Sequence, residues 1–171
     1  MKGGQIFQYA RYLDWLVTTP LLLLDLAGLA GVSMDDQISL VILDVLMILA
    51  GFAGGLAESD SATLALWFLG MIFYIPIVYD LVIVFPASAE KVGASAAATY
   101  GKIMWLTVIL WTFYPVVYFA AQYKNYIGLT GEILAYCILD VIAKCGFGFI
   151  LLFSREGLQQ AFTPGSEPLL G

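Results

Sequence analysis

The sequence predicts an all-α protein, a polytopic bundle of transmembrane helices that forms a single domain over residues 1–171. Of the residues, 61% are hydrophobic and only 12% are charged, whereas a soluble domain carries roughly 25% charged residues. The mean hydropathy is +0.92. Apolar runs close to the roughly 20 residues that cross a bilayer recur five times along the chain.

Each apolar run predicts one membrane-spanning helix. In chain order the runs are Leu16–Ala30, Ile38–Leu56, Ala62–Phe85, Ile103–Ala121 and Ile133–Phe153. We expect the helices to cover about residues 6–30, 37–57, 62–86, 99–122 and 130–154. The segments between them contain Gly, Ser, Asp or Lys and are expected to be turns: Val32–Gln37, Glu58–Ser61, Pro86–Lys102 and Gln122–Glu132. An odd number of spans puts the two termini on opposite sides of the membrane.

Charge and residue types exclude several function classes. The net charge is −6 and no Lys/Arg cluster is present, so no nucleic-acid partner is expected. The chain has no His, and no metal site is expected. No nucleophile–base pair is visible either, so we do not expect an enzyme.

Positive charges give a weak indication of topology. Three of them, Lys91, Lys102 and Arg155, fall on one predicted side of the membrane, and Lys2 and Lys124 fall on the other. Because cytoplasmic segments carry more Lys and Arg, this distribution favours a cytoplasmic C-terminus.

The first predicted helix carries charges inside an apolar span, which is costly and indicates a functional role. Asp14 and Asp25 are eleven residues apart, which puts them on one helix face about 16 Å apart along the axis. Arg11 and Thr18, at three residues before and four after Asp14, share that face. The sequence therefore predicts a polar column through the bilayer.

The last predicted helix carries a second intramembrane pair, Asp140 and Lys144, at i, i+4 spacing. One interpretation is a simple ion pair that holds the structure together. The other is chemical, because a lysine in apolar surroundings gives up its proton readily and can then form a Schiff base with an aldehyde. From these two residues alone both interpretations stay open.

Aromatic residues near the middle of three spans favour the chemical interpretation. Membrane Trp and Tyr usually gather at the interfaces, yet five lie at mid-span, together with two glycines at similar depth. Ordinary helix packing is the alternative for each of them taken singly. Together with Lys144 they predict an apolar slot for a planar ligand: Trp15, Trp67, Trp111, Tyr114, Tyr118, Gly51 and Gly70.

Three segments resemble the microbial rhodopsins, in particular the bacteriorhodopsin-like proton pumps. They are RYLDWLVTTPLLLLD (Arg11–Asp25), WTFYPVVY (Trp111–Tyr118) and LDVIAKCGFGFILLFSR (Leu139–Arg155), which resemble helices C, F and G of that family. The resemblance implies that the five spans are equivalent to helices C–G of the seven-helix fold. The chain begins at the equivalent of the third helix, and we expect helices A and B to be absent from it.

The resemblance also implies a cofactor and its chemistry. Lys144 would bind all-trans retinal covalently as a protonated Schiff base, with Asp14 and Asp140 as counterions. Asp14 would accept the proton after photoisomerisation, and Asp25 would be the donor that restores it. Thr18 matches the hydroxyl between acceptor and donor.

Further residues match other parts of the family's proton path. Arg11 matches the arginine of the extracellular side, and Glu132 matches one carboxylate of the proton-release group, whose second carboxylate has no match near Tyr123. Thr19 and Asp44 resemble the hydrogen-bonded pair that joins helices C and D. The retinal pocket implied by the resemblance comprises Trp15, Leu22, Met47, Gly51, Trp67, Gly70, Trp111, Tyr114, Pro115 and Tyr118.

The resemblance therefore predicts a retinal-binding, light-driven outward proton pump, or its C–G portion, in the plasma membrane. Its N-terminus would lie outside and its C-terminus in the cytoplasm, with the lipid bilayer and protons as partners. A homo-oligomer and a separate segment that supplies helices A and B stay open. The alternative functions are a sensory rhodopsin photoreceptor that signals through a partner and a photochemically silent membrane fragment. Asp80 has no family role, and we expect a solvated carboxylate near the end of its span.

Overall fold

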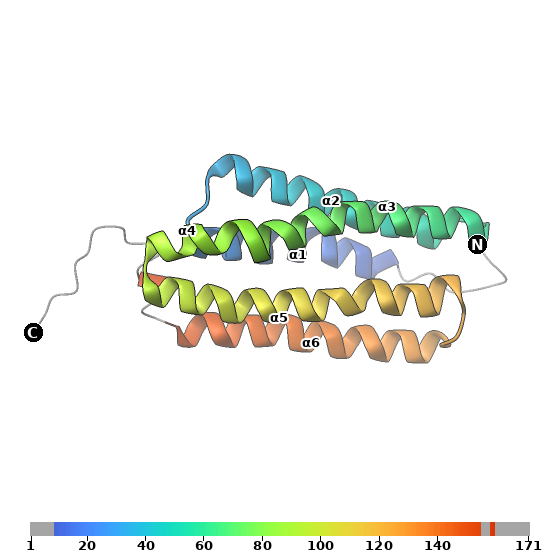
Figure 1. Cartoon of the computed structure of the whole chain (residues 1–171). Coiled ribbons are helices and arrows are strands. Elements are labelled where there is room, and N and C mark those ends of the chain that lie inside the picture. Colours follow the sequence, from blue (N-terminus) through green and yellow to red (C-terminus); the bar gives the residue numbers. More distant parts are fainter. Residues whose placement is uncertain (1–8, 155–157, 160–171) are drawn as a thin grey trace, which may run out of the picture.

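The computed structural model describes residues 9–154 and 158–159, and these form a bundle of long helices (Figure 1). The elements are α1 (Tyr9–Ala30), α2 (Met34–Leu56), α3 (Asp60–Tyr79), the π-helical η2 (Asp80–Val84), α4 (Phe85–Val92), α5 (Ala94–Tyr118), the π-helical η3 (Phe119–Tyr123) and α6 (Leu129–Phe153). Elements α3, η2 and α4 form one span, and η3 extends α5. In the described part of the chain, five helices are long and apolar enough to cross a membrane, as predicted.

Short polar segments end the first two helices as the sequence indicates. Ser33 and Ser59 cap α2 and α3, because their hydroxyls accept hydrogen bonds from the backbone N–H groups of Asp36 and Ala62 at 3.2 Å. Gly31 makes the turn after α1 with a φ of 64°. A Cβ at Gly31 would also lie 2.6 Å from Val92, so glycine is needed there for conformation and for space.

The third span is longer than the sequence predicted. The predicted turn Pro86–Lys102 is almost wholly helical, since α4 continues to Val92 and α5 begins at Ala94. Proline is tolerated because Pro86 lies in the first turn of α4, directly after the π-helical turn η2. The chain turns instead at Gly93, whose φ of 155° and ψ of 159° are open essentially to glycine alone.

A tyrosine of α5 supplies the hydrogen bond that Pro86 cannot donate. Within η2 the Phe85 amide donates to the Asp80 carbonyl, and Pro86 has no amide hydrogen to offer the Leu81 carbonyl. The buried Tyr100 hydroxyl donates to that carbonyl at 2.6 Å. This bond satisfies a buried acceptor and ties α5 to the third span.

Asp80 lies further from the end of its helix than the sequence predicted. It is the first residue of η2, and the same span continues for twelve residues to Val92. The helix therefore continues well beyond Asp80, whose side chain is partly buried, and its solvation near the membrane interface stays a prediction. The helix extends further because it continues through Pro86, where the sequence pattern had predicted the start of a turn.

Helix α1 has one buried face and one exposed face, on which Leu13 and Val17 lie. It packs against α2 on one side and α5 on the other, while α3 packs on α2 and α6 on α5. Its leucines Leu23, Leu26 and Leu29 are fully buried. Figure 1 shows α5 and α6 side by side along their length, with the start of α1 and the end of α6 at opposite ends of the bundle.

Large apolar side chains cover the outer faces of the spans, as in the exposed Ile72 and Ile75 of α3. Such a surface suits lipid rather than water. Part of the topology argument lies outside the described residues, namely Lys2, Arg155 and the predicted helical residues 6–8. The orientation in the membrane stays a prediction.

Candidate functional site

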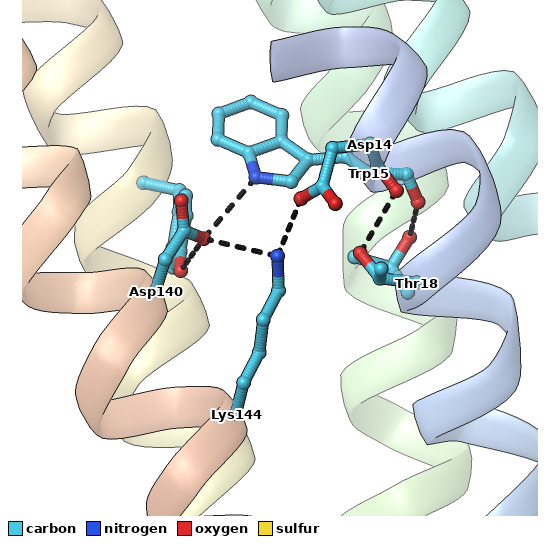
Figure 2. Close-up of polar contacts among 7 residues, drawn as sticks. Asp14, Trp15, Thr18, Asp140 and Lys144 are labelled. Atoms are coloured by element: carbon cyan, nitrogen blue, oxygen red, sulfur yellow. Dashed lines mark hydrogen bonds and ion pairs between the residues drawn. The ribbon is translucent and has the colours of Figure 1, made fainter.

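Lys144 of α6 lies between two carboxylates from different helices. Its Nζ forms a short ion pair with Asp14 Oδ2 of α1 and lies 3.9 Å from Asp140 Oδ1, one turn earlier on α6. Figure 2 shows the lysine reaching from α6 toward both acids. The structure therefore brings together the three residues predicted to bind and stabilise the Schiff base, although they lie on helices at the two ends of the chain.

Two aromatic donors hold Asp140 in place. The Trp15 indole N–H donates to Asp140 Oδ1 at 3.2 Å, and the Tyr114 hydroxyl donates to the same oxygen at 2.8 Å. Hydrogen bonds to a carboxylate are stronger than neutral ones. They hold the Asp140 carboxylate in its position beside Lys144.

A second buried charge cluster lies on the same two helices. Arg11 Nη1 of α1 lies 3.0 Å from Glu132 Oε1 of α6, and these side chains are only 12% and 7% exposed. Gln122 of η3 donates its amide to both oxygens of Glu132, at 2.9 and 3.0 Å. The Arg11 guanidinium also lies 4.1 Å from the centre of the Tyr136 ring, within cation–π range. Arg11 is thereby held toward Glu132.

The predicted proton donor lies apart from this centre. Asp25 and Asp14 are both on α1, at positions predicted to share one face, eleven residues apart. Thr18, predicted to act between them, donates its hydroxyl to the Asp14 carbonyl one turn earlier, at 2.9 Å. Its side chain thus bonds to the backbone of α1 rather than to a carboxylate.

Thr19 and Asp44 join α1 to α2. The Thr19 hydroxyl lies 2.7 Å from Asp44 Oδ2 and 2.8 Å from the Trp15 carbonyl. Asp44 is fully buried, and its Oδ1 has no hydrogen-bond partner among the described residues. A polar contact in so apolar a setting fixes the register of two helices that otherwise meet through apolar side chains, such as the Tyr12 and Phe52 rings.

A cavity opens beside Lys144 and Asp140 in the middle of the bundle. Its wall is largely aromatic and aliphatic, and α1, α2, α3, α5 and α6 all contribute to it. Every residue that the sequence analysis assigned to a ligand pocket lines it: Trp15, Leu22, Met47, Gly51, Trp67, Gly70, Trp111, Tyr114, Pro115 and Tyr118. An apolar space with a single amine at its edge suits a hydrophobic ligand with one reactive group.

Some residues of the site were missed by the sequence analysis. Tyr136 lines the cavity and stacks edge-on against Trp15, with ring centres 5.3 Å apart. A signal for it existed, because Glu132, Tyr136, Asp140 and Lys144 succeed one another at four-residue spacing. Gln122 gave no such signal, since its direction depends on the π-helical turn η3.

The site is open on one flank. The Asp14 side chain is 49% exposed and that of Lys144 is 32% exposed. Helix α6 packs mainly on α5, whereas α1 packs on α2 and α5. Side-chain contacts such as Lys144–Asp14 and Arg11–Glu132 therefore carry much of the connection between α1 and α6. Charges exposed here would face hydrocarbon, which is costly.

Comparisons with known proteins match most of this chain to one family. The family model "Bacteriorhodopsin-like protein" matches residues 1–158. The chain is 41% identical over 162 residues to bacteriorhodopsin-II of Haloarcula marismortui and 42% identical over 164 residues to archaerhodopsin-1 of Halorubrum ezzemoulense. These matches cover 93% and 95% of this chain, and 65% and 62% of the relatives.

Solved structures give the same result. The light-driven proton pump LR (Mac) from Leptosphaeria maculans matches with a TM-score of 0.86 and 37% identity, over 91% of this chain and 63% of that one. Thermophilic rhodopsin from Rubrobacter xylanophilus matches with a TM-score of 0.88 and 35% identity, over 92% and 71%. The chain is thus an integral membrane protein, and its relatives are pumps rather than enzymes.

The curated relatives are longer than this chain, which spans a little less than two thirds of their length. The expectation that helices A and B are missing from the protein is not supported by these comparisons. The family model nevertheless extends over nearly the whole chain, and the matched folds contain the same helical arrangement. The chain belongs to the bacteriorhodopsin-like family.

Proposed function

We propose that the protein is a retinal-binding, light-driven outward proton pump whose five spans are equivalent to helices C–G of the family. The observation that carries the proposal is the position of Lys144, at the edge of an aromatic cavity and beside two carboxylates from α1 and α6. A lysine used only for structure would need one partner and no cavity. This arrangement supports the chemical interpretation over a simple ion pair.

The residues present fit all-trans retinal. The cavity offers apolar and aromatic walls for a polyene and its ring, and Lys144 offers an amine for the aldehyde. Asp14 and Asp140 supply the negative charge that a protonated nitrogen on Lys144 would need in a low dielectric. When bound covalently through Lys144, retinal supplies light absorption and a light-driven change of shape.

The chain's own groups then move the proton. In the dark, Asp14 and Asp140 stabilise the proton at Lys144 Nζ. When the contact between Lys144 Nζ and Asp14 is lost and then restored in a new geometry, Asp14 accepts this proton. Trp15 and Tyr114 meanwhile hold Asp140 in place through their hydrogen bonds to Oδ1. Asp25, eleven residues along the same helix, then returns a proton to the nitrogen. Acceptor and donor thus lie at different depths of α1.

The direction of transport depends on the two sides of the centre. Arg11 and Glu132 lie on the Asp14 side, and Asp25 lies on the other. In the proposed orientation the N-terminus is outside and the C-terminus is cytoplasmic, in the plasma membrane. A proton taken from the Asp25 side and passed to Asp14 therefore leaves the cell.

Further transmembrane helices are proposed to cover the flank between α1 and α6. The Asp14 side chain is about half exposed on this side, and a bilayer would penalise its charge. Helices equivalent to A and B of the family would shield it. A sensory photoreceptor is the second candidate function, but the presence of a carboxylate at Asp25 favours the pump.

Expression with all-trans retinal tests the proposal. We expect a visible absorption band and acidification of an unbuffered cell suspension under illumination. Lys144→Ala should abolish both, whereas Lys102→Ala, an exposed lysine on α5, should keep both. Absence of a band in the unchanged protein would exclude both photoactive functions. A band without acidification would favour the sensory function, and a band that persists in Lys144→Ala would refute the covalent linkage.

A further inference from the structure

One tyrosine in the cavity wall has a hydroxyl group without a hydrogen-bond partner. Tyr118, the last residue of α5, lines the cavity and is only 6% exposed. Its Oη is buried and meets no donor or acceptor among the described residues. Buried tyrosine hydroxyls normally find a partner. The shape of its surroundings, rather than a hydrogen bond, therefore accounts for the position of this side chain.

A glycine of α2 provides the space that the hydroxyl occupies. Gly54 is buried, and a Cβ at this position would lie 2.4 Å from Tyr118 Oη and 3.4 Å from Tyr118 Cζ. A separation of 2.4 Å is shorter than real Cβ contacts allow. Any side chain at position 54 must therefore displace the Tyr118 ring.

The free space beside this ring is the cavity. The ring is otherwise enclosed by the bundle, because almost none of Tyr118 is exposed, and α2 blocks it at Gly54. A displaced ring would thus swing away from α2 and into the space that also borders Trp67 and Lys144. The side chain at position 54 consequently sets how far the cavity extends toward α2.

We propose that Gly54 and Tyr118 act as a pair that fixes the α2 wall of the cavity and limits the length and bulk of the polyene aldehyde that can reach Lys144. This inference rests on the proposed function, because the ligand class comes from it. Tyr118 is a specificity-determining residue in this proposal. Gly54 is a positioning residue that acts through Tyr118.

A double-mutant cycle tests the pair. Membranes that contain the full chain or its Gly54→Ala, Tyr118→Phe and Gly54→Ala/Tyr118→Phe variants are mixed with all-trans retinal, and the rise of the visible band is monitored. We expect Gly54→Ala to slow retinal uptake roughly tenfold, because overpacking forces the ring into the cavity. The double variant should take up retinal at the rate of Tyr118→Phe, since removing the hydroxyl removes the close contact.

Gly101→Ala is the matched control. Gly101 also lies within a helix, on α5, but a Cβ there would meet nothing within 4 Å, so uptake should stay at the unchanged rate. If Gly54→Ala takes up retinal as fast as the unchanged protein, the proposed role of the Gly54–Tyr118 pair is refuted. A double variant as slow as Gly54→Ala would overturn it as well, because position 54 would then act through another neighbour such as Leu66.

Thermal unfolding of the retinal-free protein separates this inference from the proposed function. Gly54→Ala should lower Tm, and the added Tyr118→Phe should restore it to the Tm of Tyr118→Phe. Failure of this restoration overturns the pair whatever the retinal result. If the unchanged protein takes up no retinal, the proposed function and the ligand limit fail together, whereas restored Tm still supports the Gly54–Tyr118 contact.

Discussion

Lys144 on α6 pairs with Asp14 on α1, although α6 packs mainly on α5 and α1 packs mainly on α2. The pair thus bridges an open flank of the bundle, and about half of the Asp14 side chain is exposed there. An ion pair at such a position is a poor source of stability, because a solvated pair contributes little and a lipid-exposed one is costly. Its presence therefore supports the proposed role of Asp14 and Lys144 in proton transfer.

Asp14→Asn should abolish light-driven acidification while retinal still attaches to Lys144. An amide cannot take up the proton that leaves the lysine nitrogen, whereas Asp140, at 3.9 Å, still supplies one negative charge. The measurement is external pH under illumination, alongside the visible spectrum. Asp35→Asn, in the exposed first turn of α2, is the control and should pump normally. Acidification at the unchanged rate in Asp14→Asn would remove Asp14 as the acceptor.

Asp25→Asn should slow the recovery of the photocycle by roughly 100-fold, the size of effect expected for loss of a positioned proton donor. Without the donor, the proton must come from solvent, so recovery should slow further by about tenfold for each unit of rising pH. Flash photolysis across the neutral pH range measures both effects. Recovery that is fast and independent of pH in this variant would show that Asp25 is not the donor.

Thr19→Val should destabilise the protein by about 1 kcal/mol, because it leaves the buried Asp44 carboxyl without its hydroxyl partner. The double variant Thr19→Val/Asp44→Leu should recover most of this loss, since both polar groups are then gone. Thermal unfolding in detergent measures the effect, with the exposed Thr130→Val as control. Additive losses in the double variant would contradict a direct Thr19–Asp44 interaction.

Tyr100→Phe should destabilise the protein by roughly 1–3 kcal/mol, because the Leu81 carbonyl loses its donor in a buried setting. Adding Pro86→Ala restores an amide hydrogen in the turn after η2, so it should reduce the cost of Tyr100→Phe. Unfolding midpoints of the four proteins in the cycle measure this coupling. A cost of Tyr100→Phe that is the same with Pro86 and Ala at position 86 would show that the hydroxyl serves another role.

Local sequence patterns were enough to predict the membrane-spanning helices and the charged residues around Lys144. The five apolar runs predicted five membrane-spanning helices, because a bilayer demands a minimum length of apolar helix whatever the tertiary contacts. Charges inside the predicted helices marked Asp14, Asp140 and Lys144 as functional candidates, since intramembrane charge is rare without a function. Four-residue spacing predicted that Asp140 and Lys144 share a face, and their side chains lie 3.9 Å apart.

Helix ends were harder to predict where one residue can act in two ways. Proline usually breaks a helix, so Pro86 was interpreted as the start of a turn, yet a π-helical turn before it and the Tyr100 hydroxyl allow the helix to continue. The hydroxyl comes from a residue fourteen positions further along the chain. No local pattern contains that contact.

The sequence by itself determined that the protein lies in a membrane, how many spans it has and which charged residues lie inside them. These properties depend on composition and on periodicity within single helices. Only the tertiary structure decided which groups from different helices meet. Gln122 lies in the π-helical turn η3 and reaches Glu132 of α6, and the Tyr118 side chain extends from α5 to Gly54 of α2. Both contacts depend on distances between helix axes, which no single helix encodes.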